Sequence, residues 1–307
     1  MTNTGEINLR SPANGSRQPS MRAVPVGELL RQWRGARRLS QLDLALDAGI
    51  SARHLSCVET GKAQPSRELI ARLAETLDMP LRERNMLLMA AGYTPAYAET
   101  PLGNPELTQV RRAIDFILEH QEPYPAFVLS RCWDVLQANR AAARFENFVR
   151  GGSNQNNMMR RFFDPKDLRS VVVNWEEVAG DLMRHLHDEI AASPSDFRMR
   201  TLLEDVLSYP GVPSHWRTRQ LGAAPPPLLT VVFRKDDQEF RFFSTITRFG
   251  TPRDVTIDEL RIECTFAADE ATAQLCRALA QDDAAELRAP KTQAENLGVG
   301  KSREVIL

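Results

Sequence analysis

Cysteine is scarce in this chain of 307 residues, which contains only four: Cys57, Cys132, Cys264 and Cys276. No two of them form a CxxC pair, so the spacing argues against a disulfide framework or a zinc site and predicts reduced thiols. Long apolar segments are missing as well. The chain has no run of 18 apolar residues and its N-terminus lacks the apolar core of a signal peptide, so we predict a cytoplasmic protein.

Motifs of the common enzyme classes are also absent, since the chain has no HExxH, GxSxG, P-loop or GxGxxG pattern. His185 and His187 are the nearest approach to a pair of metal ligands. Two such positions on a helix point about 200° apart, so the two rings cannot share one ion. Only His185 with Asp181 or Glu189 shares a face. We therefore predict no enzymatic activity, no bound metal and no cofactor.

The charge of the chain is balanced overall but uneven along it. The formal net charge is −1, which argues against a uniformly basic nucleic-acid coat. Residues 1–40, however, contain two glutamates, Glu6 and Glu28, and a larger set of arginines: Arg10, Arg17, Arg22, Arg31, Arg34, Arg37 and Arg38. Such a basic segment suits contacts with phosphates, although a solvated tail has the same composition.

Residues 1–24 are rich in Asn, Ser, Gly and Pro without periodicity, and we predict that they are disordered. From residue 25 an apolar stripe follows, in which Val26, Leu29, Leu30 and Trp33 recur at the spacing of one helix face. Arg31, Arg34, Arg37 and Arg38 lie off this stripe. They could therefore reach a DNA backbone.

The stretch 41–62 has the pattern of two short helices around a tight turn. Ser40 is placed as an N-cap with Asp43 in a capping-box position, and Gly49 suits a turn that needs positive φ. We expect Leu42, Ala45 and Leu46 on the inner face of the first of these helices. Ser51 caps the next helix, in which Leu55 and Val58 face inward, and Gly61 follows its end. That helix leaves Arg53, His54, Ser56 and Cys57 on its other faces.

Two more helices complete the predicted domain, which spans residues 25–92. One follows Pro65-Ser66 and turns Leu69, Ile70, Leu73 and Leu77 inward, and the last runs from about Leu81 to Ala91. This pattern is typical of a helix-turn-helix domain that binds DNA in a sequence-specific way.

These residues resemble the Xre/Cro-repressor family of helix-turn-helix proteins over about residues 26–80. The resemblance rests on Ser40-Gln41, Ala45, Gly49, Leu55, Val58 and the close Glu59-Thr60-Gly61-Lys62. It implies DNA contacts from Gln41, Ser51, Ala52, Arg53, Ser56 and Cys57. Arg53 is the best candidate for reading a base, because arginine can bind guanine O6 and N7 in a bidentate way.

The remaining DNA-contact predictions concern the backbone of the duplex. Gln41 and Ser51 are expected to clamp phosphates, as is the set of Arg31, Arg34, Arg37 and Arg38. His54 and Lys62 are further candidates, with a solvated side chain as the alternative. Ala52 and Cys57 replace the polar residues often found at these places in the family, so base readout is expected to be sparse.

The second half of the chain has a different order of elements. A proline-containing linker, 93–105, precedes a helix with Val110, Ala113, Ile114, Ile117 and Leu118 on one face. A β-prone run over 126–139 follows, then a helix over 139–150 with Phe145 and Phe148 inward. After loop 151–157 we predict helices near 167–192 and 196–208, and strands at 228–234, 239–246 and 259–266. Residues 278–307 are predicted to be a frayed tail.

The last predicted strand alternates strictly between apolar and polar residues. Leu260, Ile262, Cys264 and Phe266 fall on one side. Glu259, Arg261, Glu263 and Thr265 fall on the other. We expect this second side to face water.

Two early strands, a block of helices and three late strands give the order of a PAS-like α+β fold. Such a fold has a five-stranded antiparallel sheet with helices over one face and a pocket between the layers. Residues 106–277 resemble the ligand-binding domain of the MmyB/MltR-like regulators through Glu122-Pro123-Tyr124-Pro125-Ala126, Trp133 with Asn139-Arg140-Ala141, Asn174-Trp175-Glu176, Arg241-Phe242-Phe243-Ser244-Thr245, and the run from Phe249 to Ala271. The resemblance implies a small apolar ligand such as a fatty acid.

The expected ligand-binding residues are the aromatic side chains of this domain: Trp133, Phe145, Phe148, Trp175, Phe233 and Phe242. Plain core packing is the alternative for each of them. Together the two resemblances predict a transcriptional regulator with an all-α, lambda-repressor-like domain of five helices followed by a PAS-like sensor. We expect it to act at the nucleoid as a homodimer on a double-stranded DNA operator, controlled by a small molecule.

Two other functions compete with this interpretation. A self-cleaving phage-type repressor would need a desolvated lysine as base, but residues 105–270 contain only Lys166 and Lys235, both in polar surroundings. The other competitor is a DNA-binding protein whose second domain only dimerises or recruits partners.

Overall fold

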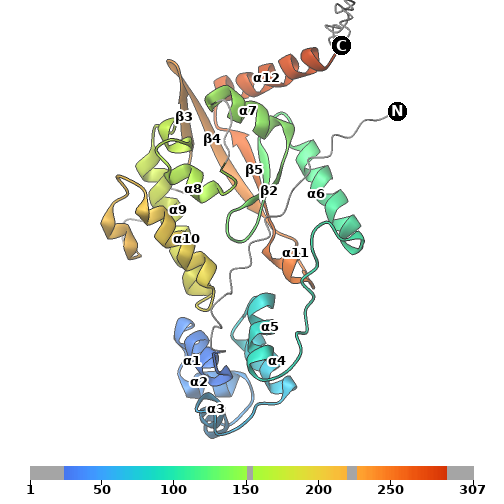
Figure 1. Ribbon diagram of the computed structural model, residues 1–307, viewed down its shortest axis with the longest axis vertical. Helices are drawn as coiled ribbons and strands as arrows, with labels where there is room; N and C mark the ends of the chain where they lie inside the picture. The colour runs from blue at the N-terminus through green and yellow to red at the C-terminus, as the bar shows by residue number, and fades with distance from the viewer. Residues whose placement is uncertain (1–23, 151–154, 220–226, 289–307) are drawn as a thin grey trace, which may run out of the picture.

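The computed structural model describes residues 24–150, 155–219 and 227–288, and every structural statement below refers to these residues. The helical domain formed by α1 to α5 lies at one end of the molecule, and an α+β domain built around a sheet forms the rest (Figure 1). Helix α3 lies at the far tip of the helical domain, away from the sheet. The predicted fold classes of both halves are confirmed.

The N-terminal domain contains the five predicted helices: α1 (Val26–Ala36), α2 (Gln41–Asp47), α3 (Ala52–Glu59), α4 (Arg67–Thr76) and α5 (Leu81–Ala90). Their apolar faces form one core in which Leu30, Trp33, Leu55 and Val58 are fully buried. The burial of these side chains is what holds helices as short as α2 and α3, because isolated helices of this length are unstable in water.

Local signals place the ends of these helices where the sequence predicted them. Ser40 Oγ accepts from the Asp43 amide, while the Asp43 carboxylate accepts from the Ser40 amide, which completes the capping box. Ser51 Oγ accepts from the His54 amide in the same way. Gly49 and Gly61 adopt φ of 65° and 73°, a region in which glycine has no Cβ penalty.

The predicted inner face of α2 is confirmed for Ala45 but was wrong for Leu42 and Leu46. Leu42 and Leu46 are 67% and 75% exposed, and the residues that face the core are Leu44, Ala45 and Ala48. Because Leu42, Leu44 and Leu46 alternate at intervals of two, they cannot share one face of a helix. The face with two small alanines is the one that packs, since it lets α2 approach α3 and α4 closely.

Gly27 marks the closest approach of α1 to α3. A Cβ built on Gly27 would lie 2.4 Å from the Glu59 carbonyl oxygen, a backbone atom that cannot rotate away. Gly27→Ala is therefore expected to lower the free energy of unfolding by about 1–3 kcal/mol through overpacking. Urea denaturation measures the change. Gly35→Ala on the same helix is the matched control; it meets nothing within 4 Å and should stabilise by about 0.5–1 kcal/mol. Equal effects at both positions would contradict the packing argument.

The C-terminal domain carries a five-stranded antiparallel sheet in the order β2-β1-β5-β4-β3. The strands are β1 (Ala126–Leu129), β2 (Val135–Ala138), β3 (Val231–Lys235), β4 (Gln238–Thr247) and β5 (Arg261–Ala267). The helices are α6 (Thr108–His120), α7 (Arg140–Arg150), α8 (Met158–Phe163), α9 (Trp175–Ala192), α10 (Phe197–Ser208), α11 (Val255–Glu259) and α12 (Glu270–Arg288). Short 3-10 turns occupy Pro105–Leu107, Leu168–Ser170 and Ser214–Arg217.

Both faces of the sheet are covered, which corrects the expectation of helices over one face. On one face Leu129, Phe240 and Phe242 pack in a core shared with α7, α8, α9 and α10. On the other face Val128 and Ile262 pack against Ile114 and other residues of α6. Strand β1 therefore contributes side chains to both cores, and β5 contributes Ile262 and Cys264 to the second.

This double cover explains why the predicted wet side of β5 was wrong. Arg261 is only 4% exposed, and Glu263 is half-buried. Their side chains face the helical layer, where the Arg261 guanidinium forms a close ion pair with Glu189 of α9. A buried charge is tolerated when it is paired in this way.

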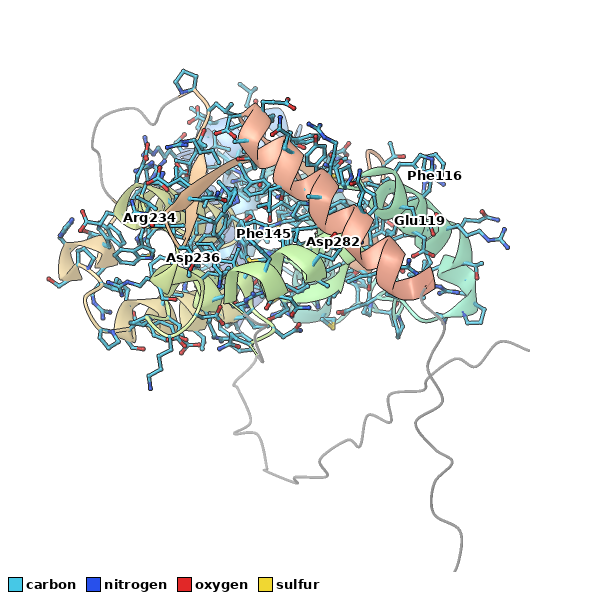
Figure 2. The ribbon with its side chains drawn as sticks, turned by 90° about the horizontal axis from the view of Figure 1, so that it is seen from above. Phe116, Glu119, Phe145, Arg234, Asp236 and Asp282 are labelled. Carbon is cyan, nitrogen blue, oxygen red and sulfur yellow. The ribbon has the colours of Figure 1, made fainter. Side chains whose placement is uncertain are left out.

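Two predicted boundaries also differ from the structure. Residues 171–174 are not helical, because Val172 and Val173 form backbone contacts with β3, so α9 begins only at Trp175. Helix α12 continues to Arg288, beyond the predicted domain end at residue 277, and lies beside α7 (Figure 2). Its second half lacks apolar periodicity, but half of residues 279–288 are Ala or Leu, which are strong helix formers. The predicted disorder of residues 1–23 and the tail after residue 288 lie outside the described residues.

The described helices include none that is long and apolar enough to cross a membrane. All four cysteines are unpaired, as predicted from their spacing.

Candidate functional site

Helix α3 presents most of the predicted DNA-contact residues on one exposed surface. Arg53 and His54 are exposed, and Ala52, Ser56 and Cys57 are half-buried beside them. Ser51 is exposed at the N-terminus of the helix, and Lys62 is exposed just after its end. The structure therefore brings these predicted residues together at the tip of the domain.

Glu59 fixes α3 to the neighbouring helices α1 and α2. The residue is only 2% exposed. Its carboxylate accepts two hydrogen bonds from Arg34 of α1, from Nε at 2.7 Å and from Nη2 at 3.0 Å. It also accepts from Gln41 Nε2 of α2 at 2.7 Å. One carboxylate at the end of α3 thus joins all three helices. No local pattern predicts that Glu59 is buried, because its partners lie on two other helices.

Three of the predicted phosphate contacts, Gln41, Arg34 and Arg37, are engaged inside the domain. Arg34 binds Glu59 and also donates to the Leu39 carbonyl. Arg37 lies over the Trp33 ring and donates to the carbonyls of Leu77 and Asp78, at the end of α4. A guanidinium at this end of a helix satisfies carbonyls that have no partner within the helix. Arg31 and Arg38 are exposed, and Gln41 is half-buried.

A cavity of about 80 Å³ lies between the sheet and the helical layer of the C-terminal domain. Three of the six predicted ligand-binding aromatics line it: Phe145 of α7, Phe233 of β3 and Phe242 of β4. Their rings contact one another edge to face, with centroids 4.8–6.1 Å apart. Figure 2 shows Phe145 on α7, in the layer that covers the strands.

The other three predicted aromatics lie elsewhere. Phe148 packs against Phe240, and Trp175 packs against Phe163 and Trp216 while donating its Nε1 to the Phe162 carbonyl. Trp133 lies near Arg261, with the guanidinium 5.4 Å from its ring centroid. Core packing, the alternative reading, describes these three. Lining residues that the sequence did not predict as ligand-binding include Phe127, Phe162, Glu146, Arg161, Ser244 and Glu263.

Glu263 is the unusual member of this lining. It lies on β5 opposite Phe127 of β1, in a wall that is otherwise largely apolar. Burial raises the pKa of Glu263, and a hydrogen bond with Ser244 offsets this only in part. A carboxyl in such a place ionises at a cost unless a cation or a donor joins it.

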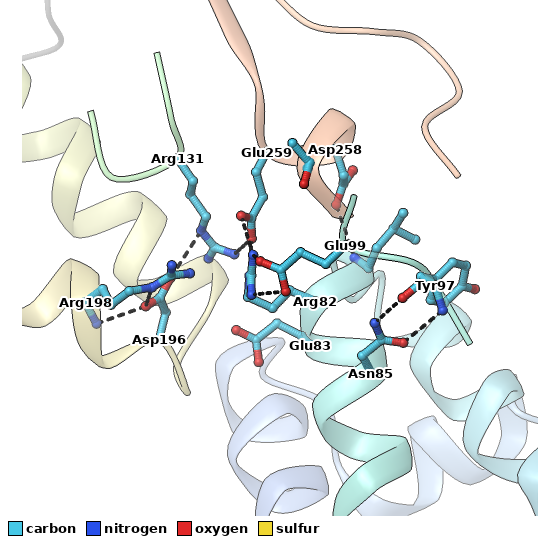
Figure 3. Close-up of polar contacts among 12 residues, drawn as sticks. Arg82, Glu83, Asn85, Tyr97, Glu99, Arg131, Asp196, Arg198, Asp258 and Glu259 are labelled. Carbon is cyan, nitrogen blue, oxygen red and sulfur yellow. Dashed lines mark hydrogen bonds and ion pairs between the residues drawn. The ribbon is translucent and has the colours of Figure 1, made fainter. Parts of the chain in front are cut away.

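The two domains meet at a polar junction centred on Arg82 of α5 (Figure 3). Its guanidinium binds Glu259 of α11 in a bidentate way, Nε to Oε1 at 2.6 Å and Nη2 to Oε2 at 2.9 Å, and Nη1 donates to Glu99 at 2.9 Å. Arg131 lies between Glu259 and Asp196, at 3.7 Å and 3.4 Å. The side chain of Glu259 is 14% exposed, so these charges interact with little solvent screening.

Further contacts tie α5 and the linker to α11. The Leu81 amide, at the first turn of α5, donates to Asp258 Oδ2 at 3.1 Å, a favourable place for a carboxylate. The linker lies along both domains: Asn85 binds the backbone of Tyr97, and Asp254 accepts from the Thr100 amide. The helical domain is thus fastened directly to the segment that leads into β5.

Glu83 is a buried carboxyl at the same junction. It is 2% exposed and accepts a hydrogen bond from Ser195 on the loop before α10. Burial raises the pKa of Glu83, and the nearby Asp196 and Glu259 raise it further, while Ser195 and Arg131 lower it. A raised pKa in the folded state means that Glu83 contributes stability at low pH and loses it as the pH rises through that pKa.

Glu83→Gln should therefore stabilise the chain more at pH 8 than at pH 5, because the amide is neutral at both. Urea denaturation of both proteins at the two pH values measures the difference. The exposed Glu75→Gln is the control and should show no such trend. An equal effect of Glu83→Gln at both pH values would contradict the burial argument.

The described residues include no group of three or more side chains suited to hold a metal ion. His185 lies 3.2 Å from Glu189, on the face that the sequence predicted, whereas Asp181 pairs with Arg184.

Comparison with known proteins agrees with these two domains. Residues 110–279 match the family described as the MmyB-like transcription regulator ligand binding domain, and residues 25–87 match a helix-turn-helix domain. The uncharacterized HTH-type transcriptional regulator RghRB of Bacillus subtilis (strain 168) is 38% identical over 76 residues, which are 24% of this chain and 52% of that protein. The chain thus spans about half the length of this relative.

A solved structure described as an RNA-binding Light-Oxygen-Voltage receptor is also similar. The TM-score is 0.22 and the identity 13%, over 85% of this chain and 64% of that one. A TM-score this low supports no statement about fold or function.

Proposed function

Because this chain belongs to the MmyB-like transcription regulators and carries a helix-turn-helix domain, we propose that it binds a DNA operator through α3. Its operator affinity changes when a small molecule occupies the cavity between the sheet and the helical layer, which we call the sensor cavity. The observation that carries the proposal is the continuous connection from the cavity through β5 and α11 to α5 of the DNA-binding domain.

The proposed DNA complex places α3 in the major groove. Arg53 is exposed at the first turn of α3, where recognition helices contact base edges, and it can bind guanine in a bidentate way. Ser51, Lys62, Arg31 and Arg38 are also exposed, and we propose that they supply phosphate contacts. Arg34 acts inside the domain, where it holds Glu59 of α3, and Arg37 binds carbonyls at the end of α4.

One domain of this size reads only a few base pairs. We therefore infer a homodimer on a two-fold symmetric operator, with half-sites about one helical turn apart. A ligand that changes the relative position of the two α3 helices would then change operator affinity.

Coupling between the cavity and α3 depends on every second residue of one short segment, which begins at the end of α11 and continues along β5. Glu259 binds Arg82 of the DNA-binding domain, Arg261 binds Glu189 of α9, and Glu263 lines the cavity. A ligand that moves β5 would change the geometry of the Arg82 contact. Such a ligand shifts the equilibrium only by the difference in its affinity for the two arrangements.

Glu259→Gln is the experiment that tests this coupling. It keeps the shape of the side chain but removes the charge that holds Arg82 and Arg131. Molecules that raise the melting temperature of the wild-type protein are first found in a metabolite screen, and then added to an operator-binding assay. We expect a change in wild-type operator affinity of roughly 5- to 150-fold, and a much smaller change in Glu259→Gln.

Glu270→Gln, which removes an exposed charge on α12, is the control and should retain the wild-type response. A full response in Glu259→Gln would contradict the proposed route. No response of the wild-type protein to any bound molecule would support the competing function, in which the second domain only dimerises or recruits partners.

A further inference from the structure

Acidic residues outnumber basic ones in the lining of the sensor cavity. Its charged lining residues are Glu146, Arg161 and Glu263. Arg161 is already neutralised within the wall, since its Nη2 lies 2.7 Å from Glu146 and its Nε lies 3.5 Å from Asp167. Glu263 is left as the carboxyl that has only a hydroxyl partner, Ser244, among its described hydrogen bonds.

The apolar part of the wall surrounds this carboxyl with aromatic rings. Phe127 lies opposite Glu263 in the β1–β5 register, and Phe145, Phe233 and Phe242 line the same cavity. The faces of such rings attract a cation, more strongly where water is excluded. Aromatic rings and one carboxyl without a counter-charge form an environment suited to a positively charged nitrogen on a small apolar body.

We propose that the cavity binds a small organic amine, whose ammonium group donates to Glu263 and whose hydrocarbon part contacts Phe145, Phe233 and Phe242. This inference rests on the proposed function, because it names the class of ligand that the sensor takes. An arriving cation would let Glu263 ionise in place, which removes the cost that burial imposes on the free carboxylate.

The same observations disfavour the fatty acid that the sequence resemblance suggested. A carboxylate in the cavity would meet Glu263 and Glu146, and the one arginine is already paired with two acids. The cavity is also too small for a fatty acid. A cavity of about 80 Å³ compares with roughly 150 Å³ for one that holds a benzene ring, so a long acyl chain would require the wall to rearrange.

Three probes with the same three-carbon skeleton test the proposal: propylamine, 1-propanol and propionate. Their dissociation constants for the full-length protein, without DNA, are measured by ligand-observed NMR titration. We expect propylamine to bind at least tenfold more tightly than either of the others. In Glu263→Gln the amine should lose at least tenfold in affinity, while 1-propanol changes little. Glu176→Gln, an exposed acid on α9, is the matched control and should bind as the wild type does.

Glu263→Gln is isosteric and replaces a buried ionisable group by a neutral amide, so it should fold, and its melting temperature checks this. Ser244→Ala provides a second variant that keeps the carboxyl and should retain the preference for the amine. Tighter binding of propionate, or an amine affinity that Glu263→Gln leaves unchanged, would overturn the proposal. In either case ligand control of operator binding would stand, because that function requires a ligand but not an amine. If none of the probes binds, the amine proposal fails, and the operator assay with molecules from the metabolite screen decides separately whether the proposed function survives.

Discussion

Arg53→Ala is expected to abolish the preference of this protein for its operator while leaving the fold intact. A bidentate contact between arginine and guanine is worth about 1–3 kcal/mol per half-site, which is roughly 5- to 150-fold in affinity. A homodimer would lose this contact at both half-sites. Arg53 is exposed, so the melting temperature should not change. Fluorescence anisotropy with operator and scrambled duplexes measures the ratio of the two affinities.

The matched control is Arg112→Ala, which removes an exposed arginine from α6 in the other domain. Arg112→Ala has the same effect on net charge and should leave the ratio unchanged. Lys62→Ala, by contrast, should weaken binding to both duplexes alike and reduce the dependence on salt, because a phosphate contact carries no sequence information. If Arg53→Ala kept the operator preference, another residue would have to read the bases.

Glu59→Ala is expected to have the largest effect on stability. Removing one partner of a buried ion pair leaves the other charge uncompensated, which costs about 3–5 kcal/mol. Here the loss concerns two hydrogen bonds from Arg34 and one from Gln41. The side chain of Arg34 is 19% exposed, so we expect the lower end of that range. Because natural domains are stable by only about 5–15 kcal/mol, the DNA-binding domain should be close to unfolding at 37 °C.

Two variants separate this explanation from a general loss of helix stability. Glu75→Ala, at an exposed position of α4, should change the free energy of unfolding by less than about 0.5 kcal/mol. The double variant Arg34→Met with Glu59→Met removes both charges and keeps the volume, so it should be more stable than Glu59→Ala. Urea denaturation measures all three. A double variant as unstable as Glu59→Ala would show that the carboxylate does not act through Arg34.

The sequence predicted best those features that depend on neighbouring residues. The capping box of Ser40 and Asp43 and the glycine turns at Gly49 and Gly61 are local signals, and all are confirmed. The amphipathic stripe of α1 and the number and order of strands could be read from periodicity in the same way. These features fixed the two fold classes before any contact between distant residues was known.

The features that the sequence did not predict depend on contacts between distant segments. Alternation identified β5 as a strand, but the polar side faces a helical layer, because Glu189 of α9 is there to pair with Arg261. The same holds for Arg34, which was predicted as a phosphate contact but binds Glu59 of α3. Among the residues that line the cavity, Phe145, Phe233 and Phe242 were predicted to be ligand-binding, whereas Glu263 was predicted to face water. A charged residue can be buried only where a partner or a cavity receives it, and the sequence pattern does not show either.

Selection of bound sequences from a random pool of DNA duplexes, using the full-length protein, tests the central claim most directly. The account predicts one enriched motif with two inverted half-sites, each with a guanine that the wild type requires and Arg53→Ala does not. Binding to this motif should weaken steeply as salt is raised. A pool that stays random after repeated selection, or an enriched motif that Arg53→Ala selects equally well, would contradict the claim that α3 reads an operator.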